Sequence, residues 1–182
     1  MSETDDLRAT VEALAARVRA LEDQVEIMQL VAQYGPAADS GAVEAAAGLW
    51  TDDGTFDVVG NFELRGREAI AGMLGGPGHQ GLIANGAAHV LTVPHIVIEG
   101  DEATGRSYAL NIRWDAAASR FLVGRVSANT WRWTRTGQGW RVAERVNANL
   151  DGTPEHRRIL APDHERRRET EGHDPRDRRG QR

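Results

Sequence analysis

The two side chains best suited to do chemistry together are Asp39 and His89. Asp39 follows a long helical segment, and His89 begins an alternating apolar stretch that is typical of a strand. A carboxylate that accepts a hydrogen bond from one imidazole nitrogen fixes the ring tautomer and leaves the other nitrogen as a general base. If the fold brings these residues together, the pair predicts an enzyme that removes a proton from carbon.

The sequence does not indicate other kinds of reactive site. The chain has no cysteine, which excludes disulfides, thiol nucleophiles and thiolate metal ligands. It has no HExxH, no GxGxxG that opens a helix after a strand, and no GxSxG. The remaining histidines do not share the context of His89 or a metal-ligand spacing with it; they are His79, His95, His156, His164 and His173. We therefore predict a reaction that needs no cofactor and no metal.

The length of 182 residues and the hydrophobic content of 40% suit one compact domain with extra segments at its ends. No apolar stretch approaches a membrane span, and the acidic N-terminus is unlike a signal peptide, which predicts a cytoplasmic protein. Residues 1–29 are expected to form a helix that leads into a domain over residues 30–154. Residues 155–182 form a charged tail that we expect to be disordered and, because acids are interleaved with its arginines, not to bind nucleic acid.

Residues 7–28 carry apolar side chains at alternating spacings of four and three, which is the a/d repeat of a coiled coil. Valine at a positions and leucine at d favour a parallel two-stranded coil, and Arg17 and Glu22 occupy g and e positions suited to an interchain ion pair. The alternative is an amphipathic helix that packs on its own domain. Gly35 and Pro36 are expected to interrupt the helix. The repeat consists of Leu7, Val11, Leu14, Val18, Leu21, Val25 and Met28.

After this helix we expect a short helix over residues 42–50, with Asp39 or Ser40 as its N-cap. A strand over residues 54–59, a return strand over 62–66, a helix over 67–76 and a loop over 77–86 follow. Four long β-rich stretches then cover residues 89–98, 104–114, 120–134 and 139–150. This order predicts an α+β fold, in which a cone-shaped, curved antiparallel sheet wraps around the N-terminal helices.

Period-two alternation sorts the residues of the four long stretches into faces. One face of each mixes small, polar and aromatic side chains: His89, Leu91, Val93 and His95; Ser107, Ala109 and Asn111; Ser127, Asn129, Trp131 and Trp133; Ala143, Arg145, Asn147 and Asn149. Such a mixture suits the lining of a ligand pocket better than a dry core.

The order of elements and several segments resemble the SnoaL-like branch of the nuclear-transport-factor-2-like superfamily. The segments are LWTDDGTFDV (residues 49–58), the lone His89, RVSANTWRW (residues 125–133) and GWRVAERVNANL (residues 139–150). Within that branch the chain is most similar to bile-acid 7α-dehydratase, scytalone dehydratase and hexachlorocyclohexane dehydrochlorinase. The resemblance covers about residues 8–150 and implies an α+β barrel, a hydrophobic pocket and an oligomer. The family is commonly trimeric, whereas the heptads favour a dimer.

The resemblance assigns roles to particular residues. His89 matches the family's proton-abstracting histidine, and Asp39 matches its partner aspartate. Tyr34 matches a tyrosine that polarises a substrate oxygen in the bile-acid enzyme. Asn129, two residues after Ser127, resembles the polar pair of scytalone dehydratase. These residues would form the catalytic and substrate-binding site.

Arg145 falls where two of these lyases place a functional arginine, whereas two other positions depart from the family. Asn111 stands where the bile-acid enzyme has an aspartate, and Val58 stands where the dehydratases tend to have a tyrosine. The chain also resembles ketosteroid isomerase, with Tyr34 and Asn129 in place of its oxyanion-hole pair. The isomerase's base position falls near Val58, so that alternative lacks its base.

Each of these residues also has a structural interpretation. Asp39 alone could be a helix cap, and His89 alone could be an ordinary histidine at a sheet edge. Tyr34 could be a core residue with a bonded hydroxyl, and Arg145 could pair with a nearby acid. Taken together, the residues favour a cofactor-independent lyase that catalyses β-elimination, most simply dehydration, of a small hydrophobic substrate such as a sterol or polyketide derivative. The alternatives are a SnoaL-like cyclase or isomerase and a non-catalytic binding protein.

Overall fold

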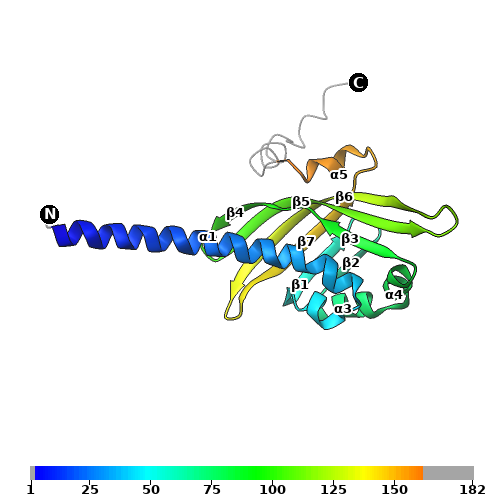
Figure 1. Cartoon of the computed structure of the whole chain (residues 1–182), viewed down its shortest axis with the longest axis horizontal. Coiled ribbons are helices and arrows are strands. Elements are labelled where there is room, and N and C mark those ends of the chain that lie inside the picture. Colours follow the sequence, from blue (N-terminus) through cyan, green and yellow to red (C-terminus); the bar gives the residue numbers. More distant parts are fainter. Residues whose placement is uncertain (1–2, 162–182) are drawn as a thin grey trace, which may run out of the picture.

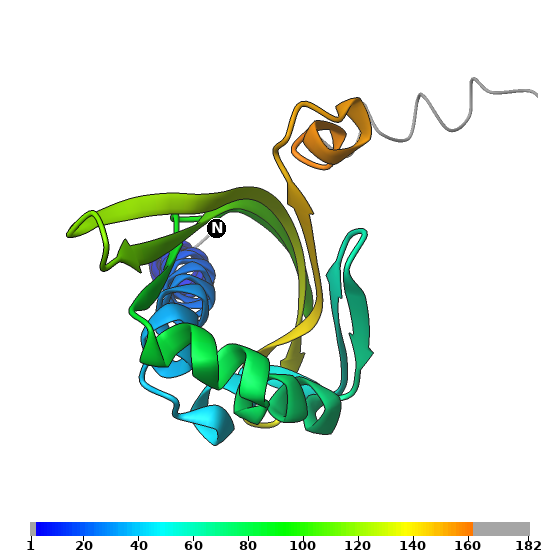
Figure 2. The same cartoon turned by 90° about the vertical axis from the view of Figure 1, so that its right-hand side faces the viewer.

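The structure is a computed structural model that describes residues 3–161. A curled sheet of seven strands wraps around the second half of a long helix, and short helices close one end of the fold (Figures 1 and 2). The helices are α1 (Glu3–Asp39), α2 (Val43–Ala47), α3 (Arg67–Gly75), α4 (Pro77–Ala84) and α5 (Pro154–Arg158). The strands are β1 (Trp50–Val58), β2 (Phe62–Arg65), β3 (Ala87–Leu91), β4 (His95–Glu99), β5 (Glu102–Asp115), β6 (Arg120–Thr136) and β7 (Gly139–Asn149). The predicted α+β class is confirmed.

The sheet is mixed rather than purely antiparallel. Its strand order is β2-β1-β7-β6-β5-β3, and β4 also pairs with β5. All pairs are antiparallel except β1 with β7, which run parallel. A meander alone would have given only antiparallel pairs, but here the first strand pairs with the last, which closes the curve around the helices.

The predicted break in α1 at Gly35 and Pro36 is wrong, because the helix continues to Asp39 with Pro36 inside it. Proline removes one backbone donor and normally bends or ends a helix. Packing against β3 stabilises this end of the helix, because Gly35 lies directly against the backbone of His89. Contacts between elements thus outweigh the local preference of one proline.

Other predicted boundaries also need correction. Residues 77–86 are mostly helical, because Pro77 begins α4 in the first-turn position where proline is favoured. The stretch over residues 89–98 is two strands, β3 and β4, separated by Thr92–Pro94, since Pro94 has no N–H to donate to the sheet. The residues between the predicted helix (42–50) and the predicted strand (54–59) lie within β1, where the pairing with β7 shifts register between Trp50 and Thr55.

The core lies between the second half of α1 and the concave face of the sheet. Ile27, Leu30 and Val31 of α1 are buried together with Trp50 and Trp133. In contrast, the earlier apolar positions of α1 are between 51% and 64% exposed; they are Leu7, Val11, Leu14, Val18, Leu21 and Val25. Figure 1 shows this first half of α1 extending beyond the sheet.

A cluster of polar contacts, which we call the neck, fixes α1 where it leaves the domain. Asp23 accepts two hydrogen bonds of 2.7 Å from the guanidinium of Arg135, and a third of 3.0 Å from the indole N–H of Trp140. Glu26 accepts the backbone N–H of Trp140 at 2.8 Å. Gly139 has a φ of 92°, and a Cβ there would collide with the Glu26 carboxylate, so this glycine permits the close approach.

The described helices include none that is long and apolar enough to cross a membrane. Residues 155–158, at the start of the predicted disordered tail, lie in α5. Residues 162–182 of that tail lie outside the described residues.

Candidate active site

Asp39 and His89 are in contact through two hydrogen bonds. Asp39 Oδ1 lies 2.5 Å from His89 Nδ1, and Asp39 Oδ2 accepts the backbone N–H of His89 at 2.7 Å. Both side chains are largely buried, with 21% and 14% exposure. Because the carboxylate orients Nδ1, Nε2 is the ring nitrogen left to exchange a proton. The carboxylate is thus used by His89, and α2 instead begins after Ala42 with no side-chain cap.

The contact depends on how closely α1 approaches β3. A Cβ added at Gly35 would lie 2.2 Å from the carbonyl oxygen of His89, so only glycine allows this packing. Asp39 lies one helical turn after Gly35, on the same side of the helix. Helix α1 therefore presents its last carboxylate to the strand that carries the histidine.

His89 lines a cavity of about 530 Å³. This volume lies in the range of small-molecule sites. Its apolar walls come from β1, β2, α3, α4 and β3; they include Phe56, Val58, Phe62, Met73, Leu82 and Leu91. Its polar lining comprises Tyr34, Asn61, His79, His89, Asn111, Arg113, Arg125, Arg145 and Asn147.

The pairing of the strands arranges the polar residues in rows across the concave face. One row runs from His89 on β3 through Asn111 on β5 to Arg125 on β6. A second row runs from Ser107 on β5 through Asn129 on β6 to Asn147 on β7. Residues from distant parts of the sequence meet in this way on one surface.

The buried cation Arg145 lies in a cage of aromatic rings. Its guanidinium carbon lies 4.6 Å from the ring centres of Tyr34 and Trp131 and 4.7 Å from that of Phe56. Its Nε donates to Asn129 Oδ1 at 2.9 Å. Burial lowers the pKa of Arg145, and the nearby Tyr34 acts in the opposite direction. The aromatic faces offset part of the cost of burying this charge.

His79 on α4 is a ring that the sequence did not single out. It stacks on His89 with ring centres 5.5 Å apart, and within the described residues neither of its ring nitrogens has a hydrogen-bond partner. Burial, and secondarily the neighbouring His89, lowers the pKa of His79. His79 therefore faces the cavity as a neutral ring near pH 7.

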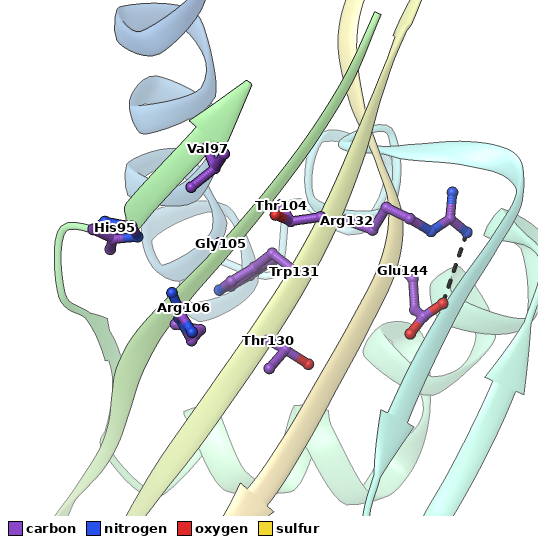
Figure 3. A pocket seen from close by; sticks show the side chains of 9 residues that line it. All are labelled: His95, Val97, Thr104, Gly105, Arg106, Thr130, Trp131, Arg132 and Glu144. Carbon is purple, nitrogen blue, oxygen red and sulfur yellow. Dashed lines mark ion pairs between the residues drawn. The ribbon is translucent and has the colours of Figure 1, made fainter. Parts of the chain in front are cut away.

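A second hollow, of about 170 Å³, lies elsewhere on the sheet (Figure 3). Thr130 and Arg132 line it, and they alternate along β6 with the inward-facing Asn129 and Trp131. Arg132 forms an ion pair of 3.7 Å with Glu144 there. None of the predicted site residues lines this hollow.

The structure gathers most of the predicted site residues at one place. Tyr34, Val58, His89, Asn111 and Arg145 line the cavity. Asp39 supports His89 from outside the lining, and Asn129 supports Arg145. Ser127 is fully buried and is not part of the lining.

Several positions on the predicted strand faces do not line the cavity, and His95 and Ala143 are examples. His95 is exposed on β4, because the chain changes strand at Pro94. Ala143 lies in a bulge opposite the step between Arg132 and Trp133, so Val142 rather than Ala143 faces the core.

Asn147 lines the cavity, as its predicted strand face suggested, whereas Arg125 is a lining residue that the sequence argument did not place there. Extending the alternation of β6 back from Ser127 would have found Arg125. His79 gives no comparable signal, because its stacking on His89 depends on where α4 lies. Among residues 3–161, no group of three or more His, Asp and Glu side chains could hold a metal ion.

A family model described as a SnoaL-like domain matches residues 19–146, which include Asp39, His89 and Arg145. The chain belongs to the SnoaL-like family. Members of this family are often enzymes, including cyclases, isomerases and dehydratases. A comparison with curated proteins gave no match.

Several solved structures share the fold. A nuclear-transport-factor-2-like protein with a cystatin-like fold from Novosphingobium aromaticivorans is 46% identical, with a TM-score of 0.79; the match covers 82% of this chain and 96% of that one. A variant of a Mycobacterium tuberculosis protein of unknown function is 26% identical, with a TM-score of 0.63 and coverage of 71% and 79%. A Catenulispora acidiphila protein in complex with S-DNPA is 25% identical, with a TM-score of 0.61 and coverage of 74% and 97%.

Proposed function

We propose that this SnoaL-like protein is a cofactor-independent lyase that eliminates water from a small molecule with a hydrophobic body. The observation that carries the proposal is the 2.5 Å contact between Asp39 Oδ1 and His89 Nδ1, with His89 lining a cavity of about 530 Å³. An oriented, neutral imidazole beside an apolar binding surface can act as a general base toward a C–H bond.

In the proposed reaction, His89 Nε2 takes a proton from the carbon next to a carbonyl group. The electron pair of that C–H bond forms the new double bond as the neighbouring C–O bond breaks. The departing hydroxide takes the proton from the His89 imidazolium and leaves as water, so atoms and charge balance without another acid. Asp39 stabilises the imidazolium while it exists.

Tyr34 would stabilise the negative charge that develops on the substrate oxygen, since the ring centres of Tyr34 and His89 are 6.3 Å apart. Arg145, whose guanidinium lies over the Tyr34 ring, would anchor an anionic group of the substrate. Asn129 does not line the cavity, and its carbonyl oxygen is engaged by Arg145 and Asn147. We therefore assign Asn129 a positioning role rather than contact with substrate.

The test uses a panel of carbocyclic β-hydroxy ketones, with formation of the conjugated enone followed by absorbance. His89→Ala should lower turnover by about two to four orders of magnitude while ligand affinity changes little, because a general base contributes about that factor. His95→Ala is the matched control, since His95 is exposed on β4.

A parallel loss of affinity and turnover in His89→Ala would contradict the proposed role. Deuterium uptake from solvent without loss of water would instead indicate an isomerase or cyclase. Tight binding with neither exchange nor elimination would indicate a binding protein.

A further inference from the structure

The cavity holds an excess of positive charge that the described residues do not neutralise. Its described lining includes Arg113, Arg125 and Arg145, but no aspartate or glutamate. The nearby Asp39 is engaged with His89. An apolar cavity with unneutralised guanidinium groups is a poor site for a purely neutral hydrocarbon.

Two of these arginines have buried donor atoms that are left without a partner. Arg145 is 3% exposed, and within residues 3–161 its buried Nη1 has no hydrogen-bond partner. The buried Nε of Arg125 is also unpartnered there. Arg125 is half-buried, and burial lowers the pKa of both side chains. Buried unpaired donors are costly, so a bound acceptor would be strongly favoured.

The two arginines are linked to each other by amides rather than by acids. Arg125 Nη2 donates to Asn147 Oδ1 at 2.5 Å, and Asn147 Nδ2 donates to Asn129 Oδ1 at 3.1 Å. The same Asn129 oxygen accepts from Arg145 Nε. An amide fixes the orientation of a guanidinium without cancelling its charge. This network holds two cations ready for an anion that is not part of the protein.

We propose that the ligand of this cavity is an amphipathic carboxylic acid whose carboxylate binds at Arg125 and Arg145. Guanidinium groups match carboxylates in geometry and charge. The hydrophobic body of the ligand lies against Phe56, Val58 and Phe62. This inference rests on the proposed function for the reaction, and it adds the substrate class.

The sheet register also sets the size of the ligand. His89 and Arg125 lie in one cross-strand row, two strands apart, with Asn111 between them. Adjacent strands are about 4.8 Å apart, so these two positions are separated by about 10 Å. A body of about two fused rings spans that distance. The carboxylate and the acidic carbon are therefore at opposite ends of the molecule.

The test compares two probes of the same shape, naphthalene-2-carboxylate and naphthalene-2-carboxamide, by isothermal titration calorimetry. The wild-type protein should bind the carboxylate about tenfold more tightly or better, because the amide leaves both cations unpaired. Arg125→Gln should remove most of this preference while leaving amide affinity nearly unchanged. Arg132→Gln, on the other face of β6, should keep the full preference.

Equal or tighter binding of the amide by the wild-type protein would overturn the proposal, as would a preference that survives in Arg125→Gln. The titrations are repeated in His89→Ala, because binding needs no proton transfer. A carboxylate preference in a protein that never turns over would refute only the lyase function. Turnover of neutral ketones with no carboxylate preference would refute only the substrate class.

An independent observation concerns the first half of α1. Its six apolar heptad positions are more than half exposed, although they form one continuous stripe. Arg17 and Glu22 flank the stripe at g and e positions, and in a parallel pair Arg17 faces Glu22 of the partner subunit. Such a stripe on a protruding helix is a surface that a second copy can bury.

We infer that residues 7–25 form a parallel two-stranded coiled coil with a second copy of this chain. The charge pattern favours a second copy of this chain as the partner. Arg17 at g meets Glu22 at e only when the two helices run parallel. The neck at Asp23 fixes where the coil ends and the domain begins. The two cavities then lie at the same end of the dimer.

The absence of native cysteine allows a direct test. Val18→Cys places one thiol at an a position, and oxidation should convert most of the protein to a covalent dimer, because a positions meet their own counterparts only in a parallel coil. Ala20→Cys, on the exposed opposite face, is the control and should remain monomeric on a non-reducing gel.

Sedimentation of the full chain complements the cross-linking test. Val18→Asp should abolish a concentration-dependent dimer, and Ala20→Asp should not. A wild-type protein that is monomeric at all concentrations would overturn the inference. An oligomer unchanged by Val18→Asp would overturn it equally, since that result assigns assembly to the barrel.

Discussion

The two halves of α1 have similar apolar repeats but very different surroundings. The second half buries Ile27, Leu30 and Val31 under the curved sheet and carries Tyr34 and Asp39 into the site. The first half exposes its stripe to solvent. The comparison shows that a hydrophobic repeat predicts a face that needs burial but does not identify the partner that buries it.

The largest expected difference between the halves concerns matched apolar truncations. Ile27→Ala should lower the free energy of unfolding by about 2–5 kcal/mol, because it leaves a cavity in a fully buried core. At concentrations where the chain is monomeric, Val18→Ala should change it by no more than about 0.5 kcal/mol, because Val18 is exposed in the single chain. Chemical denaturation of both variants measures the two values. Comparable losses would show that both halves belong to one cooperative unit.

The second test concerns the close approach of α1 to β3. Gly35→Ala should destabilise the domain by about 1–3 kcal/mol and sharply lower turnover, because the new methyl group collides with the His89 carbonyl and separates Asp39 from the ring. Gly72→Ala is the matched control, since open space surrounds that helical position. This control should be neutral or raise stability by roughly 0.4–1 kcal/mol. Unchanged activity in Gly35→Ala would contradict the proposed arrangement.

The polar contacts of the neck should contribute less to the free energy of unfolding than the buried core residues do. Asp23→Asn keeps an acceptor but removes the charge that pairs with Arg135, so we expect a loss of about 1–2 kcal/mol in thermal unfolding. Asp6→Asn, in the exposed half, should have no measurable effect on the domain. If the two variants behave alike, the boundary between the halves does not lie at Asp23.

The smallest effect should be a pH dependence of stability caused by His79, which stacks on His89. The pKa of His79 is lowered from 6.5 in the folded protein, so the unfolded chain binds its proton first as the solution is acidified. Stability is therefore complete above pH 6.5 and decreases as the pH falls toward the folded pKa. His79→Gln should flatten this decrease in denaturation curves between pH 7 and pH 5. A slope identical to that of wild type would show that His79 does not titrate in this range.

Residue types and spacing predicted the α+β class and the curved sheet, because alternation and composition are local properties of the chain. They also singled out Asp39 and His89, which the structure brings into contact. The family resemblance supplied the positions of Tyr34 and Arg145, and the catalytic roles of these four residues stay predictions.

The remaining errors arise where contacts between distant segments override local preference. Pro36 stays helical because β3 packs against the end of α1. Ala143 faces outward because β7 has a bulge, which the alternation of residues along one strand does not reveal. His79 gained its place only through the docking of α4, which the sequence presented as a loop.

The parallel pair of β1 with β7 has a consequence for biosynthesis. Its partner residues are separated by roughly ninety positions in the chain, and β7 also supplies Arg145 and Asn147. A ribosome must therefore make nearly the whole domain before β1, already able to pair with β2, can pair with β7. During that interval one edge of β1 is unpaired and can pair with another chain. A chaperone that binds the nascent domain at this stage would prevent such aggregation.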